Sequence, residues 1–453
     1  IHNGPALFGV NKRNFTHLFD GFAKPIRWHF DGSGHANFST EFLLTNSFRE
    51  SVEMKDIAPY FLFMAPSPPF GWRKKIAQLI HGLDNVNINI AKLQGKFLYL
   101  SDVWKVYSSE SQFLRDVALV KPEVPAKFGT MNNIALSSSH PLIFDDSQPN
   151  GPLLNYYIDA IFGGMAIHLC KMVSPTKRLF FAQVPVRRLP YMHSFGATRS
   201  HVILFGHPLY MDLFKILKNE AALKAFLWEP EVGSTIYIVN KRTGTVQTFN
   251  ERAMVMSHFV NAYETDAGKI IADFVTYPDP SPFAMFEMDI ITNSTRRNKV
   301  NIFMSRIRRF VFDLKTNVSL EVRTPNFDGL ANRLEMPIIN EKFRYHSYCF
   351  VYGITMLSDK ENFSDFRLVK RDLCHGRDLV WSKPGFYPSE PRFVARPGAS
   401  EEDDGLLFCT FLDGFKRVSY LGVFDGKTLT EVNKSYLPTF IPFLLHGQYF
   451  PAL

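Results

Sequence analysis

Short apolar runs with alternating polar positions recur along almost the whole chain and predict β-strands. Three of the clearest are Lys96–Ser101, Ser234–Val239 and Gly405–Phe411, which are rich in β-branched or aromatic residues. The turn-forming pairs that separate such runs include Asp31-Gly32, Asp413-Gly414 and Asp425-Gly426. Many short strands at this spacing predict an all-β fold, and seven propeller blades of about 65 residues would use the whole chain.

Two stretches depart from the strand pattern. Residues 213–228 place apolar side chains at helical spacing with Lys215, Lys218 and Lys224 between them, which predicts a short basic amphipathic helix. Residues 59–83 combine phenylalanine, methionine and tryptophan with a basic cluster. The helix at 213–228 fits either a cap on the propeller face or an anchor at a membrane surface, and residues 59–83 fit either a packed loop or a segment at a membrane surface.

Composition is typical of one folded globular unit. The 453 residues are 46% hydrophobic and 21% charged, which excludes wholesale disorder, and no clear linker divides them. We therefore expect a single β-propeller domain over residues 1–453. The chain begins with Ile1 rather than Met, which predicts truncation at the N-terminus. Its most apolar stretch, residues 58–71, is broken by Pro66, Pro68 and Pro69, so no membrane-spanning segment is expected.

Charge and cysteine content narrow the choice of partners and compartment. The net charge of +8 would suit an anionic membrane or nucleic acid, but no basic run interleaved with stacking aromatics occurs, so nucleic acid is not expected. The 44 phenylalanines indicate either core packing or a long apolar ligand tunnel. The four cysteines show no metal-binding or disulfide-rich spacing, which favours a reducing compartment. We expect a cytoplasmic protein that associates peripherally with membranes, and the organelle is left open because the N-terminus is expected to be truncated.

Four histidines stand at intervals that resemble multiples of one structural repeat. His140, His193, His258 and His446 are separated by 53, 65 and 188 residues, and 188 is close to three times 63. A radially repeated fold would direct such residues at a shared axis. Neutral imidazole is a common ligand of transition metals, so the spacing raises the hypothesis of a metal at the centre of a propeller.

Several motifs, in one consistent order, resemble those of the carotenoid cleavage oxygenases. They are Asn3–Pro5, Leu18–Gly21, Tyr191–Gly196, His258–Glu264, Phe386–Pro391, Glu401–Gly405 and His446–Gly447. The resemblance runs nearly end to end and is to the animal-type branch, which includes carotene oxygenases and the visual-cycle retinoid isomerase. It implies a seven-bladed β-propeller with one Fe(II) on its axis and O₂ as co-substrate. The implied iron ligands are His140, His193, His258 and His446.

The resemblance also implies that three carboxylates hold the second ring nitrogens of these histidines. The implied pairs are Glu335 with His258, Glu390 with His446 and Asp102 with His193. Relatives carry glutamate at the third position, and aspartate is one methylene shorter. We expect the backbone to move in, a water to bridge, or the correspondence to fail there. Stilbene-cleaving relatives carry lysine immediately before this carboxylate; Ser101 stands there instead, which favours an apolar polyene substrate.

Three functions are compatible with these residues. The leading hypothesis is a non-haem Fe(II)-dependent dioxygenase that cleaves a double bond of a carotenoid or apocarotenoid to carbonyl products, drawing its substrate from a membrane through residues 59–83 and 213–228. The second is a retinoid isomerase or isomerohydrolase on the same fold, with iron as a Lewis acid. The third is a non-catalytic propeller that binds a carotenoid. The oligomeric state is not indicated by the sequence.

Overall fold

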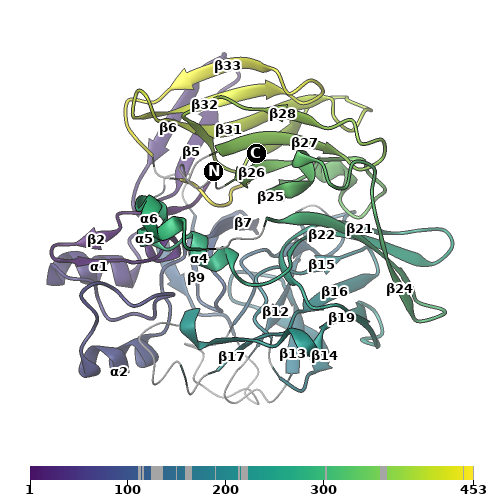
Figure 1. Cartoon of the computed structure of the whole chain (residues 1–453), viewed down its shortest axis with the longest axis horizontal. Coiled ribbons are helices and arrows are strands. Elements are labelled where there is room, and N and C mark those ends of the chain that lie inside the picture. The colour runs from purple at the N-terminus through teal and green to yellow at the C-terminus, as the bar shows by residue number, and fades with distance from the viewer. Residues whose placement is uncertain are drawn as a thin grey trace.

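A computed structural model shows a β-propeller in which sheets are arranged around a common centre (Figure 1). The structure describes residues 1–453 except 111–113, 115–116, 124–135, 149, 159–165, 189, 213–214, 216–222, 301–303, 358–364, 442 and 452–453. Within the described residues, six antiparallel sheets have four or five strands each. The propeller predicted from the strand pattern is therefore confirmed.

The first three blades follow one another along the chain. The first contains β7 (Asn89–Leu93), β8 (Lys96–Leu100), β9 (Val106–Ser109) and β10 (Val117–Val120). The second contains β11 (Leu142–Ile143), β12 (Leu153–Tyr157), β13 (Ala166–Met172) and β14 (Arg178–Pro185). The third contains β15 (Gly196–Ala197), β16 (His201–Gly206), β19 (Ser234–Asn240) and β20 (Val246–Glu251).

The last three blades use longer strands. The fourth contains β21 (Val255–Glu264), β22 (Lys269–Tyr277), β23 (Arg306–Asp313) and β24 (Val318–Val322). The fifth contains β25 (Leu334–Ile338), β26 (Phe350–Leu357), β27 (Asp365–Asp372) and β28 (Leu379–Trp381). The sixth contains β29 (Phe386–Pro388), β30 (Arg392–Ala395), β31 (Gly405–Asp413), β32 (Val418–Asp425) and β33 (Glu431–Tyr436).

The described residues form six complete blades, and a smaller sheet built on a hairpin takes the place of the seventh predicted blade. The hairpin of β5 (Ile26–Phe30) and β6 (Ala36–Thr40) has only two strands and packs on the sixth blade, where the ring centroids of Phe30 and Phe408 lie 5.0 Å apart. Isolated bridges join Ile26 to His2 and His2 to Gly447, so segments from the two ends of the chain extend this hairpin. The chain does not divide into seven equal parts because the blades differ in length: the first spans residues 89–120 and the fourth spans residues 255–322.

Short helices and small hairpins lie outside the blades. The α-helices are α1 (Asn46–Met54), α2 (Trp72–His81), α4 (Pro282–Met285), α5 (Met288–Thr292) and α6 (Ser294–Arg297). The 3₁₀ helices are η1 (Leu18–Asp20), η4 (Leu223–Ala225), η5 (Pro230–Val232), η6 (Leu330–Arg333) and η7 (Glu341–Phe343). The hairpins pair β1 (Pro5–Ala6) with β4 (Phe22–Ala23), β2 (Gly9–Val10) with β3 (Arg13–Asn14), and β17 (Leu209–Met211) with β18 (Phe226–Trp228). No helix among the described residues is long and apolar enough to cross a membrane.

The helix predicted at residues 213–228 lies mostly outside the described residues, and the prediction is wrong for its last part, residues 223–228. Residues 213–214 and 216–222 lie outside the described part of the chain. Lys215 is helical, whereas residues 223–228 form the one-turn η4 and then β18, in which Leu227 pairs with Tyr210 of β17. The conformation here is determined by strand pairing and by burial of Ala225. The spacing of apolar residues along the chain predicts neither the pairing nor the burial.

The expectation of reduced cysteines is wrong at one pair. Cys349 and Cys374 form a disulfide with a Cα–Cα distance of 5.3 Å, while Cys170 and Cys409 are free and buried. Cys349 immediately precedes β26 and Cys374 follows β27, so pairing of these strands brings the two cysteines together. Their separation of 25 residues along the chain does not show this.

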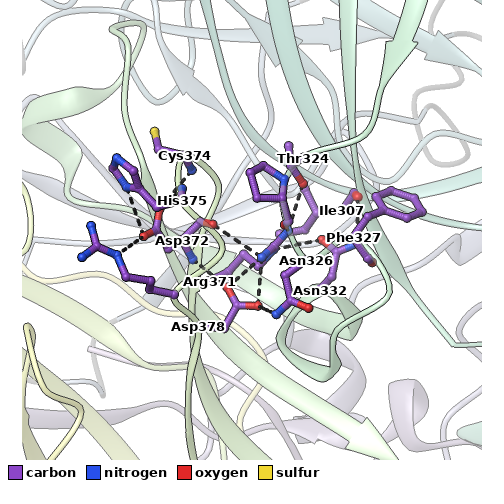
Figure 2. A network of polar contacts seen from close by, with 12 residues as sticks. Ile307, Thr324, Asn326, Phe327, Asn332, Arg371, Asp372, Cys374, His375 and Asp378 are labelled. Carbon is purple, nitrogen blue, oxygen red and sulfur yellow. Dashed lines mark hydrogen bonds and ion pairs between the residues drawn. The ribbon is translucent and has the colours of Figure 1, made fainter.

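A fully buried arginine links the fourth and fifth blades (Figure 2). Arg371 of β27 contacts Asp378 at 2.7 Å and donates to Thr324 Oγ1 at 2.9 Å and to the Pro325 carbonyl. Its Nε donates to Asn332 of η6. A buried charge is tolerated when it is paired and fully hydrogen-bonded, so this network fixes the contact between the two blades.

Replacing Asp378 with alanine is expected to lower the free energy of unfolding by about 3 kcal/mol, because Arg371 then remains buried without its carboxylate. The matched control is Asp365→Ala, which removes a partly exposed pair with Arg367 of the same strand and is expected to cost less than about 1 kcal/mol. Thermal denaturation followed by circular dichroism compares the two variants. Equal losses would show that the buried pair contributes no more than a surface pair.

Candidate metal centre

The four histidines predicted from sequence converge on one point. His140 and His193 lie just before β11 and β15, the first strands of their blades, while His258 lies within β21 and His446 in the segment that pairs with His2. Nε2 of His140 is 3.0 Å from Nε2 of His193, and Nε2 of His258 is 3.2 Å from Nε2 of His446. One ring nitrogen from each of the four lies within 4.8 Å of the others.

Three of the imidazoles are held from behind by carboxylates. The Nδ1 contacts are His258 with Glu335 at 2.6 Å, His446 with Glu390 at 2.9 Å, and His193 with Asp102 at 2.6 Å. These are the three pairs that the motifs implied. For His140 the structure gives a backbone contact, in which its N–H donates to Ser138 Oγ at 3.0 Å. Each supported ring is therefore fixed with Nε2 directed at the common centre.

Asp102 reaches His193 directly in spite of its shorter side chain. Its Oδ2 also accepts from the Tyr191 hydroxyl at 3.0 Å, and its Oδ1 accepts from the Ser139 hydroxyl at 2.8 Å and from the Ser139 N–H at 3.2 Å. Burial by itself raises the pKa of Asp102, but the charge of His193 and these donors outweigh it, and the pKa is lowered. The sequence did not indicate that Tyr191 and Ser139 donate to Asp102, although each lies within two residues of a predicted ligand.

Glu335 has a comparable set of donors. The Ser257 and Tyr277 hydroxyls donate to its Oε1 at 2.7 and 2.6 Å, and the Met336 N–H donates to its Oε2 at 2.9 Å. Burial opposes ionisation, yet the charge of His258 and these hydrogen bonds lower the pKa of Glu335 to about 2. The carboxylate is therefore ionised and accepts the Nδ1 proton of His258. Tyr277 was not singled out from the sequence, since its contact with Glu335 joins β22 to β25 of the next blade.

The donor arrangement fits a cation at the centre. Carboxylates that accept Nδ1–H leave Nε2 as a bare lone pair, as in both His258 and His446. The lone pairs of these two rings, 3.2 Å apart, repel unless a positive ion lies between them. Imidazole nitrogens about 2.0–2.1 Å from one metal and at right angles would themselves be about 3 Å apart. Burial lowers the pKa of His446 to about 4, and burial with the other three rings lowers the pKa of His140, so the neutral, metal-binding form is favoured.

A cavity of about 510 Å³ opens onto this cluster. His193, His258 and His446 form part of its wall, and most of the rest is apolar. The segment 59–83 supplies Phe61, Leu62, Phe63, Leu79, Ile80 and Leu83, and the described part of 213–228 supplies Phe226. Short helices and loops therefore cover the site, as predicted.

Three aromatic rings meet inside the cavity. The ring centroids of Phe63, Phe226 and Phe283 lie 5.8–6.1 Å from one another, although the residues come from the segment after α1, from β18 and from α4. The Tyr191 ring contacts Phe226 at 4.9 Å and its hydroxyl contacts Asp102, so the aromatic wall extends to the histidine cluster. Such a surface suits a long apolar ligand.

A propeller that gathers four histidines beside an apolar cavity defines a candidate non-haem metal protein. The chain belongs to the family described as retinal pigment epithelial membrane protein, the carotenoid cleavage oxygenases, which matches residues 1–451. It is 25% identical to human beta,beta-carotene 15,15'-dioxygenase, over 99% of this chain and 89% of that protein. It is also 25% identical to the carotenoid isomerooxygenase of Galleria mellonella, over 100% and 90% of the two chains.

Solved structures support the same fold. A cobalt-substituted Synechocystis apocarotenoid oxygenase superimposes with a TM-score of 0.80 at 22% identity, covering 98% of this chain and 90% of that one.

Proposed function

We propose that the protein is a non-haem Fe(II)-dependent dioxygenase that cleaves one double bond of a carotenoid or apocarotenoid into two carbonyl products. The observation that carries the proposal is that four histidine rings point their Nε2 atoms at one place, at the wall of a large apolar cavity. The four are His140, His193, His258 and His446. These four residues would hold the iron, and Asp102, Glu335 and Glu390 would orient three of them.

Iron(II), when bound, would supply the centre at which dioxygen is activated; four neutral ligands leave the ion its full charge and open positions. The cavity would select the double bond by how deeply the polyene enters, because the bonds of a polyene are chemically similar. In the overall reaction both atoms of O₂ are added to one C=C bond, that bond and the O–O bond break, and two C=O groups form. No proton is transferred overall, so the apolar walls are compatible with the reaction.

Metal content and activity test the proposal together. The purified protein is expected to contain stoichiometric iron and to convert β-carotene or an apocarotenal to shorter aldehydes, measured by elemental analysis and chromatography. Removal of iron with a chelator should stop the reaction, and iron(II) but not zinc(II) should restore it. Protein that binds carotenoid but holds no iron, in spite of adequate supply, would instead favour the non-catalytic binding function.

The alternative on the same fold is isomerisation or isomerohydrolysis of a retinyl ester. The family description and the Galleria mellonella relative, named an isomerooxygenase, are the observations that favour it. The two reactions differ in their use of dioxygen. Formation of cis-retinol from a retinyl ester without O₂ uptake, measured with an oxygen electrode, would support the alternative.

A membrane-facing surface is expected beside the cavity. Trp72, Ile76 and Ile80 of α2 are spaced four residues apart and are 68, 51 and 63% exposed. Ile80 also lines the cavity, so the cavity approaches the surface here. The adjacent Arg73, Lys74 and Lys75 would suit anionic headgroups. We propose that α2 lies on a membrane surface from which the apolar substrate enters, with the protein peripheral and cytoplasmic.

Replacing Trp72 and Ile76 together with glutamate is expected to lower binding to anionic vesicles at least about tenfold. The reason is that each of these exposed side chains would contribute about 1.5–3 kcal/mol when it becomes buried in the membrane. Co-sedimentation with phosphatidylserine vesicles measures the change. Phe415→Glu is the control, since Phe415 is even more exposed but lies in the turn between β31 and β32. Equal vesicle binding by the wild type and the α2 variant would exclude α2 as the contact.

A further inference from the structure

The three carboxylates behind the histidines differ in their electrostatic surroundings. Besides its histidine, Asp102 accepts hydrogen bonds from hydroxyl and backbone N–H groups, and so does Glu335; among the described residues, no cationic side chain contacts either carboxylate. Glu390 is different, because the guanidinium of Arg392 donates to its Oε2. One of the three supporting charges is therefore neutralised and two are not.

The contacts of Glu390 place Arg392 directly behind His446. Glu390 Oε1 accepts from His446 Nδ1 at 2.9 Å, and Oε2 accepts from the Gly447 N–H at 3.0 Å as well as from Arg392. Glu390 is 3% exposed and Arg392 is 21% exposed at the side chain, so solvent screens this pair only partly. Burial opposes ionisation of Glu390, but the charge of Arg392 is the foremost of the influences that lower its pKa.

Other charged groups nearby leave this balance intact. His2 Nε2 lies 3.5 Å from Glu390 Oε2, but burial lowers the pKa of His2 to about 4 and keeps it neutral at physiological pH. Burial opposes ionisation of Glu341, but Arg344, which contacts it at 2.7 Å, lowers its pKa, and Arg392 adds less to this effect. Since Glu341 and Arg344 already form a neutral pair, the charge of Arg392 remains to compensate Glu390.

We propose that Arg392 is a positioning residue that neutralises Glu390 and so makes the centre less negative on the His446 side than on the His193 and His258 sides. The inference rests on the proposed iron site. A positive charge held near iron disfavours the ferric ion relative to the ferrous ion. Arg392 thereby stabilises the ferrous state in which the enzyme would be active.

The test is a potentiometric titration of the iron, followed by the electron paramagnetic resonance signal of high-spin ferric ion. Arg392→Gln is expected to retain iron and to raise the ferric-to-ferrous ratio at a fixed potential about tenfold, which for one electron is a midpoint about 59 mV lower. Arg392→Lys keeps the charge and should stay near the wild type. Arg396→Gln, which removes an exposed pair with Asp404 at the end of the same strand, should not shift the ratio.

An unchanged ratio in Arg392→Gln, or an equal shift in Arg392→Lys, would overturn the proposal while leaving the iron site intact. Wild-type protein without iron would instead refute the proposed function itself. If Arg392→Gln fails to fold, Glu390→Gln is compared with Glu390→Gln/Arg392→Gln. The double variant should show the higher ferric-to-ferrous ratio by about tenfold, and equal ratios would contradict the role of Arg392.

Discussion

Replacement of His258 with alanine is expected to abolish both iron binding and polyene cleavage. The change removes a nitrogen that lies 3.2 Å from His446 Nε2 and leaves Glu335 buried without its principal partner. Loss of a direct ligand should exceed the 10- to 100-fold loss of metal affinity that is typical when a supporting residue is replaced. Elemental analysis and product chromatography on the same preparation measure the two effects.

The control for this variant is His29→Ala, since His29 is exposed on the β5–β6 hairpin. It should keep full iron content and activity. A His258→Ala protein that retains stoichiometric iron would show that three histidines suffice or that the metal lies elsewhere, and either result would contradict the four-histidine site.

Asp102 is expected to give the second largest effect. Asp102→Ala should raise the dissociation constant for iron by about 10- to 100-fold, because His193, Tyr191 and Ser139 all lose their acceptor. Asp102→Glu restores the charge but adds a methylene where these donors already surround the carboxylate. We expect it to weaken iron binding less than alanine does, by about 3- to 10-fold.

Competition with a chromogenic chelator measures these constants. If Asp102→Glu bound iron as tightly as the wild type, the surroundings of Asp102 would not be adapted to the shorter side chain. Circular dichroism of each iron-free variant shows whether the propeller itself is retained.

The histidines and their carboxylates were predictable because each lies in a local motif. His193 and His258 stand within runs that are distinctive by themselves, and the order of the motifs assigned Glu335 and Glu390 to their partners. The structure brings these groups within 2.6–2.9 Å of one another, as expected. The metal-binding role assigned to them remains a prediction.

Features that depend on pairing between distant segments were not predictable. Tyr277 reaches Glu335 because β22 and β25 of neighbouring blades lie together, and the disulfide of Cys349 depends on the pairing of β26 with β27. The two-stranded hairpin in place of a seventh complete blade likewise depends on the bridges of His2. The spacing of apolar residues predicts one strand or helix at a time and does not indicate which distant segments will pair.

Cleavage in an ¹⁸O₂ atmosphere tests the central proposal most directly. The iron-loaded protein is incubated with β-carotene, an apocarotenal and a retinyl ester in parallel, and the products are trapped quickly and analysed by mass spectrometry. The proposal predicts two carbonyl products from a carotenoid or apocarotenoid, each with one ¹⁸O atom from dioxygen. An unlabelled cis-retinol from the retinyl ester, with no labelled aldehyde from either polyene, would contradict it.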